Sequence, residues 1–405
     1  MGLAPEHPDA LKNLGCILYR MARFGEARVH LEAALARKPS GDHEIPYNLG
    51  AVAYALGDLP AAEHWFAEAA AAAPTEEARS KALVQMAYPV LAGGDYQRGL
   101  ALYEHRLADI ASTQVWELGI PEWRGEDLGA KHILVHGDQG SGDDIQFGRF
   151  LGALAKRAQR VTLAVSRDLM PLFTWPSFRC RDLAVTDIDG DLPVADYHSG
   201  TCSYPRYLDL ELPPTKFRPY IAAERASLPK PPGTELTIGL VWAPRPLGEI
   251  SARRIVPLDG LLELATIPGV ALYSLQVGEA ACELAGGAGL LVEDLSRRLR
   301  DWGDTAQYMA ALDLIISVDS APLHLAGAMG RPCIGLLPYV PCWRWGFGGA
   351  NGTGGRTPWY PTMRLLRQNA PGDWGGVIHQ LRHAVQSHKA WPDRDLQEKG
   401  GNIWR

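Results

Sequence analysis

The sequence predicts a helical repeat domain followed by two α/β halves. A motif recurs after 35 residues near the N-terminus, short apolar runs alternate with helical stretches after residue 130, and a proline-rich segment separates two sets of these runs. Repeats and alternating strands bury their apolar faces in different ways, so they predict separate regions. We expect repeats over 1–110, α/β halves over 111–232 and 233–390, and a tail over 391–405.

The repeat motif defines the first region. Asn13-Leu14-Gly15 returns as Asn48-Leu49-Gly50 at an offset of 35 residues, and Ala27, Ala34 and Pro39 recur at the same offset. The pattern resembles the tetratricopeptide repeat, in which two antiparallel helices touch at small residues. Gly15 and Ala27 would allow that approach, and a third, weaker unit has Gly99 at its small position. Four leucines are expected to fill the space between the helices: Leu11, Leu14, Leu18 and Leu31.

Two roles for the repeats stay open. Their groove binds a peptide or protein partner, or they only cap the next domain. An array of about three units is close to the minimum for stability, and the pattern supports the two roles equally.

The second region alternates strands and helices. A parallel sheet built from βαβ units is therefore expected in each half, and ligands would bind beyond the carboxyl ends of its strands. Residues 171–235 are predicted to form a proline-rich loop, which ends in an inter-domain linker at 229–233. The expected strands cover residues 132–136, 161–165, 236–242, 270–275, 312–318 and 333–337.

Composition limits the function. The chain has 405 residues, 46% of them hydrophobic and 21% charged, with a formal charge of −6. Such a balance is typical of a soluble globular protein, and without a basic face nucleic-acid binding is disfavoured. No apolar stretch of about 18 residues or signal-peptide pattern is visible, and the six scattered cysteines suggest free thiols in a reducing compartment. We therefore expect a cytoplasmic protein with no integral membrane segment.

The segment 313–332 carries the strongest local signal. A buried strand ends in Asp319, Ser320 is a good N-cap, and Pro322 suits the first helical turn. A helix N-terminus has free N–H groups and a partial positive charge, which together bind anions. The alternative is an ordinary turn between strand and helix, and the residues alone favour neither.

Five motifs in order carry a family resemblance. VDSAPLHLAGAMGRP resembles the signature of family 9 glycosyltransferases, the ADP-heptose:lipopolysaccharide heptosyltransferases, and GDQGSGDDIQF, DWGDTA, LPYVPCWRWG and PWYPTMRLLRQ resemble their other elements. Nearly the whole chain is similar to bacterial proteins that fuse tetratricopeptide repeats to such a domain. The resemblance implies a GT-B fold, with two Rossmann-like domains facing a cleft and the nucleotide-sugar held mainly by the second.

The resemblance also implies a catalytic base. Asp143 aligns with the family's Gly-Asp aspartate, which would take the proton of the acceptor hydroxyl in an inverting transfer. Asp138 and Asp144 are rivals, and helix capping is the alternative role for Asp143. Other cleft candidates are Gln139, Gly142, Asp144, Gln146 and Trp242.

The donor side follows in the same way. Asp319 aligns with the aspartate that contacts the donor sugar, and Ser320, Ala321 and His324 align with the phosphate-binding turn, although His324 could instead be a packed helix residue. Pro322 departs from the family pattern because it has no N–H to offer a phosphate. Further candidates for the phosphate clamp and nucleotide are Arg245 (also a departure), Arg253, Arg254, Gln276, Asp304 and Thr305. Solvated loop arginines and helix capping are the alternatives for these residues.

The remaining expectations concern partners and chemistry. The resemblance implies a transferase that needs no metal, because the family is generally metal-independent, so we expect neither metal nor cofactor. Two aromatic clusters, 343–345 and 359–361, could stack on a base, line an acceptor cleft or pack structurally. Cys342 replaces the family's usual Asp, which nothing in the sequence explains.

The leading hypothesis is an inverting glycosyltransferase. Its donor would be a nucleotide-sugar, with ADP-linked heptose favoured by kinship, and its acceptor a protein recruited by the repeats. A lipopolysaccharide-type glycan acceptor stays open. So do two other classes: a non-catalytic repeat adaptor with a degenerate transferase domain, and a GT-B sugar-nucleotide epimerase or hydrolase.

Overall fold

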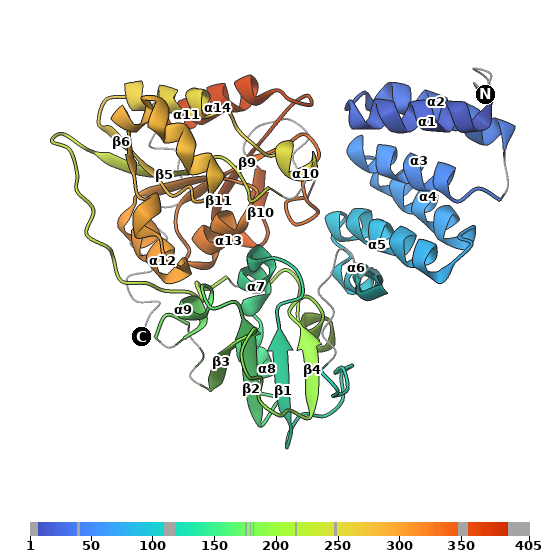
Figure 1. Cartoon of the computed structure of the whole chain (residues 1–405), viewed down its shortest axis with the longest axis horizontal. Helices are drawn as coiled ribbons and strands as arrows, with labels where there is room; N and C mark the ends of the chain where they lie inside the picture. Colours follow the sequence, from blue (N-terminus) through green and yellow to red (C-terminus); the bar gives the residue numbers. More distant parts are fainter. Residues whose placement is uncertain are drawn as a thin grey trace. The chain divides into compact units, whose positions relative to one another are not determined.

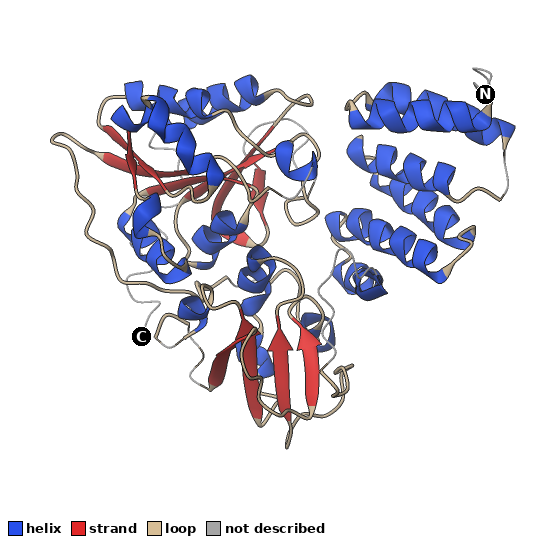
Figure 2. Ribbon diagram, viewed as in Figure 1, coloured by secondary structure: helices blue, strands red, loops and turns tan. Residues whose placement is uncertain are grey.

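The chain forms two compact units in a computed structural model (Figure 1). The first comprises Met1–Trp116 with Tyr339–Ala350, and the second comprises Glu117–Pro338 with Asn351–Arg405. The predicted combination of helical repeats and two parallel-sheet halves is confirmed (Figure 2). The structure describes residues 7–38, 41–108, 118–174, 176–178, 180, 182–214, 217–246, 249–346 and 355–387, so the expected tail 391–405 lies outside the described residues.

Three helical hairpins form the repeats. Their helices are α1 Pro8–Arg20, α2 Phe24–Arg37, α3 Glu44–Ala55, α4 Leu59–Ala71, α5 Glu76–Ala92 and α6 Tyr96–Tyr103. The glycines of the motif set the distance between paired helices. A Cβ on Gly15 would lie 2.6 Å from Cγ of Leu31, and one on Gly50 would lie 2.8 Å from Cδ1 of Phe66. Only glycine permits this approach, so the predicted role of the small residues is confirmed.

In the second and third hairpins, a glycine followed by an aspartate forms the turn between the two helices. Gly57 and Gly94 have φ values of 79° and 93°, in the left-handed region that glycine adopts without strain. Each precedes an aspartate that caps the next helix: Asp58 accepts a hydrogen bond from the backbone N of Ala61, and Asp95 accepts one from Arg98.

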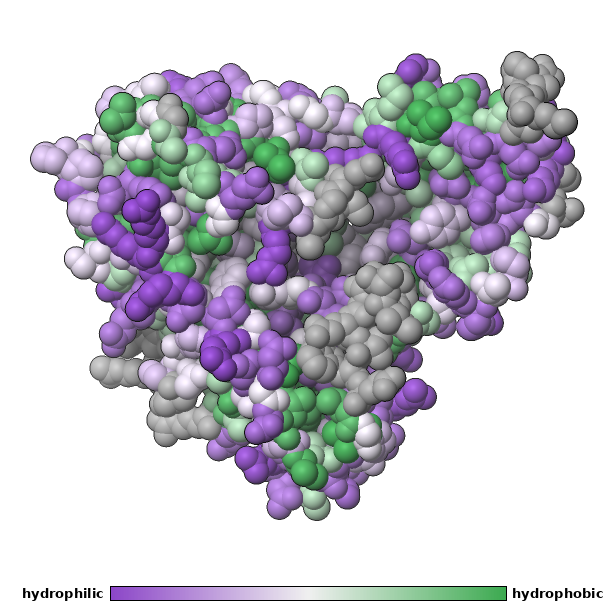
Figure 3. Space-filling view, in the orientation of Figure 1, coloured by the Kyte–Doolittle hydropathy of each residue, from purple (hydrophilic) through white to green (hydrophobic). Residues whose placement is uncertain are grey.

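One expectation for the repeat core is wrong. Leu14 was expected between the helices, but it is 39% exposed, whereas its counterpart Leu49 is 2% exposed. Leu49 packs into the core that the first and second repeats share, and Leu14 has no described repeat before it. Ile17, Met21 and Val29 are exposed on the same hairpin, where Figure 3 shows apolar surface.

The first sheet of the second unit is four-stranded and parallel, in the order β3-β2-β1-β4. Its strands are β1 His132–His136, β2 Arg160–Val165, β3 Leu183–Asp187 and β4 Tyr197–Gly200, and its helices are α7 Ser141–Gly148, α8 Leu151–Leu154 and α9 Met170–Phe173. β1 and β2 occupy the predicted positions. The segment 171–235 was expected to be loop, but it contains α9, β3 and β4.

The second sheet has seven strands in the order β10-β11-β9-β8-β5-β6-β7, antiparallel only between β10 and β11. Its strands are β5 Leu236–Val241, β6 Val270–Ser274, β7 Val292–Asp294, β8 Leu314–Val318, β9 Cys333–Leu337, β10 Gly355–Thr357 and β11 Tyr360–Arg367. Its helices are α10 Glu249–Ala252, α11 Leu258–Leu262, α12 Trp302–Ala311, α13 Ala321–Ala328 and α14 Trp374–Gln386. The four strands expected in this half are all present.

Two further properties bear on the expectations. All six cysteines are free thiols, as predicted. Among the residues with a described structure, no helix is both long and apolar enough to cross a bilayer.

The glycine contacts make the repeat packing testable. We expect Gly50→Ala to lower the free energy of unfolding by about 1–3 kcal/mol, because the added methyl group overlaps the ring of Phe66. Chemical denaturation measures this change. Gly25→Ala is the matched control, since a Cβ there meets nothing within 4 Å. It should leave stability unchanged or raise it, and equal losses in both variants would contradict the packing explanation.

Candidate functional site

The first turns of α7 and α13 touch, which joins the two sheets of the second unit (Figure 1). A Cβ on Gly142 would lie 3.1 Å from Cδ2 of His324 and 3.4 Å from Cα of Ala321. Helix α7 follows β1 and helix α13 follows β8, so the carboxyl ends of these two strands face each other. The segment expected to hold the base therefore lies next to the segment expected to hold the donor.

Buried carboxyl groups gather beyond β1 and β4. Asp138 is 1% exposed, and its Oδ1 accepts a hydrogen bond of 3.3 Å from the backbone N of Cys202. A Cβ on Gly200 would lie 2.5 Å from Oδ2 of Asp138, and one on Gly137 would lie 3.0 Å from Oδ2 of Asp144. Glycine at these two positions makes room for both side chains.

Asp143 lies in the first turn of α7 and is half-buried. Its Oδ2 accepts a hydrogen bond of 3.2 Å from the backbone N of Gly140, directly before the helix. This is the capping contact that the sequence left open as an alternative. Capping fixes the orientation of the carboxylate, and the role of Asp143 as a base stays a prediction.

Asp144 carries a proton at neutral pH. Burial raises its pKa from 3.8 to about 8, and the negative charges of Asp143 and Asp138 act in the same direction. The hydrogen bond with Thr201 lowers the pKa of Asp144, but the effect of burial is larger. The hydroxyl of Thr201 also donates to the carbonyl of His136 at 2.8 Å. The three aspartates then carry fewer negative charges than their number suggests.

The donor-side turn holds an arginine–aspartate pair. Asp319 is buried, and its Oδ2 lies 3.6 Å from Nη1 of Arg254, which also donates to the backbone carbonyl of Asp319 at 3.3 Å. Ser320 occupies the N-cap position of α13, as predicted, but the expected side-chain cap is wrong: its hydroxyl donates to the carbonyl of Val318 at 3.1 Å. Pro322 is the second residue of the helix.

His324 is a packed residue in this structure. It is buried, and its Nδ1 lies 3.0 Å from the hydroxyl of Tyr360. The packing that the sequence gave as an alternative is therefore present, and Ala321 beside it forms the contact with Gly142.

Gln276 bridges the ends of two strands. Its Oε1 accepts hydrogen bonds from the backbone N of Trp242 and Ala243, and its Nε2 donates to the carbonyls of Ala243 and Val277. These bonds use the full donor and acceptor capacity of the amide. Gln276 thus shapes the loop after β5. Trp242 is fully buried, and its Nε1 donates to Glu283.

The remaining candidates are distributed more widely. Asp304 accepts hydrogen bonds from Arg300, which lower its pKa, and Thr305 donates to the carbonyl of Asp301. Both residues lie in the first turn of α12, which the side chain of Asp301 caps by accepting a hydrogen bond from the backbone N of Asp304. Arg245 and Arg253 are exposed. Gln139 is half-buried after β1 and Gln146 is buried in α7.

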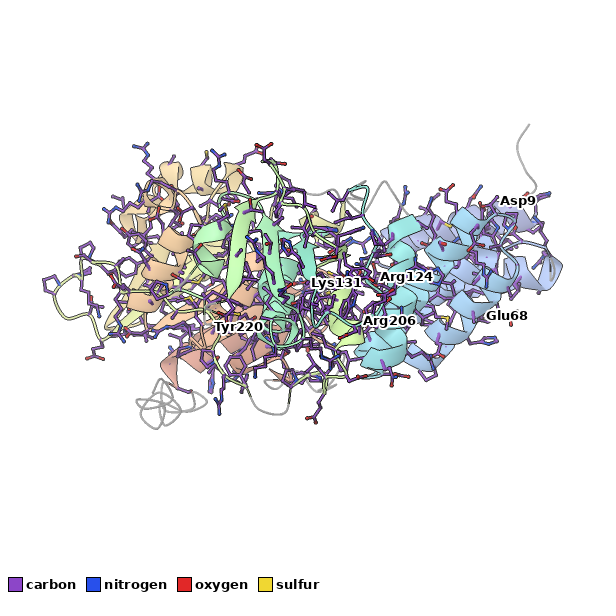
Figure 4. The ribbon with its side chains drawn as sticks, turned by 90° about the horizontal axis from the view of Figure 1, so that it is seen from below. Asp9, Glu68, Arg124, Lys131, Arg206 and Tyr220 are labelled. Carbon is purple, nitrogen blue, oxygen red and sulfur yellow. The ribbon has the colours of Figure 1, made fainter. Side chains whose placement is uncertain are left out.

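Arg149 and Tyr220 are two important residues that the sequence analysis missed. Tyr220 is labelled in Figure 4. Its hydroxyl donates to the carbonyl of Ile145 in α7, and its backbone N donates to the carbonyl of Ala328 at the end of α13. The guanidinium of Arg149 lies 4.7 Å from the ring centre of Tyr360 and donates to the carbonyl of Trp359. The aromatic cluster 359–361 therefore packs around Arg149. The arginine two residues after the IQF motif was the available signal.

The protonated state of Asp144 predicts how stability depends on pH. Between pH 3.8 and about 8 the folded protein keeps a proton that the unfolded chain has lost, so this residue lowers stability as the pH rises. Asp144→Asn removes this effect because an amide does not titrate in this range. We expect the variant to gain up to about 1.4 kcal/mol per pH unit relative to the parent in this window. Urea denaturation at several pH values tests this, and parallel stability curves would contradict it.

Two segments of the chain match known protein families. Residues 302–354 match the model of glycosyltransferase family 9 (heptosyltransferase), and residues 5–38 match a tetratricopeptide repeat. Protein FlbA of Caulobacter vibrioides is 26% identical, over 95% of this chain and 74% of its own length.

Solved structures with related folds score low. Heptosyltransferase II of E. coli, an ADP-heptose lipopolysaccharide heptosyltransferase, is 15% identical, covers 64% of this chain and 100% of its own, and has a TM-score of 0.42. An O-GlcNAc transferase mutant of Thermobaculum terrenum is 15% identical and covers 98% of this chain and 85% of its own at a TM-score of 0.29. Both scores lie below 0.5, so the assignment rests on the family matches and on the motifs. The chain thus carries an N-terminal segment that matches a tetratricopeptide repeat and a C-terminal-half segment, 302–354, that matches glycosyltransferase family 9.

Proposed function

We propose that the protein is an inverting glycosyltransferase that transfers a sugar from a nucleotide-sugar to an acceptor hydroxyl. The contact between the first turns of α7 and α13 is the observation that carries this proposal, because Gly142 lies against Ala321 and His324. A base in α7 and a diphosphate at α13 would then be adjacent, as a direct transfer requires.

Asp143 is the base in this proposal. It accepts the proton of the acceptor hydroxyl, whose oxygen bonds to the anomeric carbon from the side opposite the leaving group. The bond from that carbon to the diphosphate breaks, and the nucleoside diphosphate leaves with the electron pair. Protonated Asp144 keeps a further negative charge away from the incoming substrate.

The leaving diphosphate needs positive charge. The N-terminus of α13 supplies free N–H groups, although Pro322 removes one of them. Arg254 contributes a guanidinium that is already placed beside Asp319. These groups supply the charge that a metal ion would otherwise provide, and the reaction is accordingly metal-independent in this proposal.

The donor and acceptor are finer points of the proposal. Similarity to glycosyltransferase family 9, a family of heptosyltransferases, favours an ADP-linked heptose as the donor. The repeats favour a protein acceptor, because helical repeats commonly present an extended binding surface. The place of action in this proposal is the cytoplasm.

Two substitutions separate the roles of the two aspartates. We expect Asp143→Asn to bind the donor normally and to lose about 100- to 10,000-fold in transfer rate, because it cannot take a proton. Asp319→Ala should weaken donor binding by about 10-fold or more, because a hydrogen bond to a charged group is lost. Transfer assays with radiolabelled sugar and calorimetric donor binding measure these effects. Asp127→Asn, a change before β1 in the same half, is the control. Full transfer by Asp143→Asn would show that Asp143 is not the base.

A non-catalytic adaptor is the second candidate, favoured by the missing N–H of Pro322. A panel of ADP, UDP, GDP and CMP in thermal unfolding distinguishes the two. A ligand at about 100 times its Kd stabilises the folded state by about 2.7 kcal/mol, so a shift with one nucleotide supports a donor site. Well-folded protein that responds to none of them supports the adaptor.

A further inference from the structure

A segment far from the repeats in sequence belongs to the same compact unit. Residues 339–350 lie between β9 and β10 along the chain, yet they group with the repeats. The described part of this segment includes Tyr339–Trp345, here called the internal segment. It contains aromatic residues on both sides of Pro341.

The internal segment begins on the first repeat. The rings of Tyr339 and Phe24 are stacked, with centres 6.0 Å apart and planes 13° apart. Tyr339 and Val340 also pack against the core shared by the first and second repeats. This end of the segment therefore completes an apolar surface of the repeats.

The second repeat forms a hydrogen bond with the backbone of the internal segment. The hydroxyl of Tyr54 in α3 donates to the carbonyl of Pro341 at 3.4 Å. Burial raises the pKa of Tyr54 well above its ordinary value, so the hydroxyl keeps its proton and remains a donor. A contact with a carbonyl group does not depend on the identity of the side chain.

The third repeat holds the aromatic end. Trp343 makes an edge contact with Tyr103 of α6, at 6.4 Å between ring centres, and the guanidinium of Arg344 lies 4.2 Å from the ring centre of Trp343. Trp343, Arg344 and Trp345 are all buried. The segment thus contacts all three repeats in sequence.

Three aromatic side chains of the repeats, Tyr54, Tyr88 and Tyr103, form a row. Tyr88 of α5 lies between Tyr54 and Tyr103, with ring centres 6.4 and 6.2 Å from theirs. With Phe24, these residues form what we call the aromatic face: Phe24, Tyr54, Tyr88 and Tyr103.

We propose that the aromatic face is a peptide-binding surface, that the internal segment is its built-in ligand, and that a partner polypeptide binds there only by displacing this segment. The partner would be an extended stretch with aromatic side chains flanking a proline, since this is the chemistry that the face already accepts. The proposal does not depend on the transfer reaction.

Covalent attachment makes the internal segment a strong competitor. A tethered ligand has an effective concentration on the order of millimolar, so a free peptide of about 10 μM intrinsic Kd would bind about 100-fold more weakly. Weakening the segment should therefore expose the face to peptides added in solution.

A labelled peptide tests this on the full chain. The probe is fluorescein-labelled Tyr-Val-Pro-Ser-Trp-Arg-Trp, which copies residues 339–345 with serine in place of Cys342. We expect Trp343→Ala in the protein to tighten its binding at least 10-fold over the parent in fluorescence anisotropy. Trp374→Ala, a tryptophan in α14, is the control and should behave like the parent. A probe in which both tryptophans are alanine should not bind the variant.

Equal binding by the parent and the Trp343→Ala variant, or no binding by either, would overturn the proposal. Hydrogen exchange on the parent protein keeps the test valid if the variant does not fold. The backbone N–H groups of residues 342–346 should exchange as slowly as those of α3 and α5. Fast exchange there, with the repeat helices still protected, would show that the segment does not occupy the face.

Discussion

The contact between the first turns of α7 and α13 is the constraint on which the candidate site depends. It favours glycine at position 142 and small residues at the start of α13, because a Cβ on Gly142 would lie 3.1 Å from Cδ2 of His324 and 3.4 Å from Cα of Ala321. Next to this contact, the hydroxyl of Tyr220 donates to the carbonyl of Ile145 in α7. Arg149 donates to the carbonyl of Trp359. These buried polar contacts give the two sheets a defined register, which apolar packing alone specifies poorly. The relative position of Asp143 and Asp319 follows from this packing.

The same region concentrates charge of both signs. Three aspartates follow β1 within seven residues, and the first turns of two helices direct positive ends toward the same place. Burial resolves the crowding by keeping Asp144 protonated. The surroundings of Asp144 thus set its protonation state without any additional residue type. On the donor side of the candidate site, Arg254 places a positive charge beside Asp319.

Much of the fold could be predicted because its signals are local. The repeat glycines recur at a fixed offset, and the six expected strands are apolar runs at the centres of the sheets. Four of the missed strands lack that signal: β4 is Tyr-His-Ser-Gly, β11 contains Pro361, and β7 and β10 have three residues each. The fifth, β3, is Leu-Ala-Val-Thr-Asp and was missed because it lies in a segment rich in proline. Leu14 was misplaced because a repeat motif does not show whether a neighbour covers it.

The site was predicted in part for the same reason. Motif order located Asp143, Arg254 and Asp319, but the sequence does not state which polar groups a side chain already satisfies. Gln276 illustrates this, since its amide is used by backbone groups 33 and 34 residues away. The partners of Arg149 and the protonation of Asp144 likewise depend on distant segments that meet only in the fold.

The internal segment also has a consequence for biosynthesis. The repeats are complete in the chain by Tyr103, whereas the segment that covers their aromatic face starts at Tyr339. Ribosomes add about 5–20 residues per second, so on the order of 10–50 seconds pass before the covering residues exist. During that interval the aromatic face of the nascent chain is open to chaperones and to other polypeptides. The order of synthesis thus gives outside partners access to this surface before the protein's own segment can reach it.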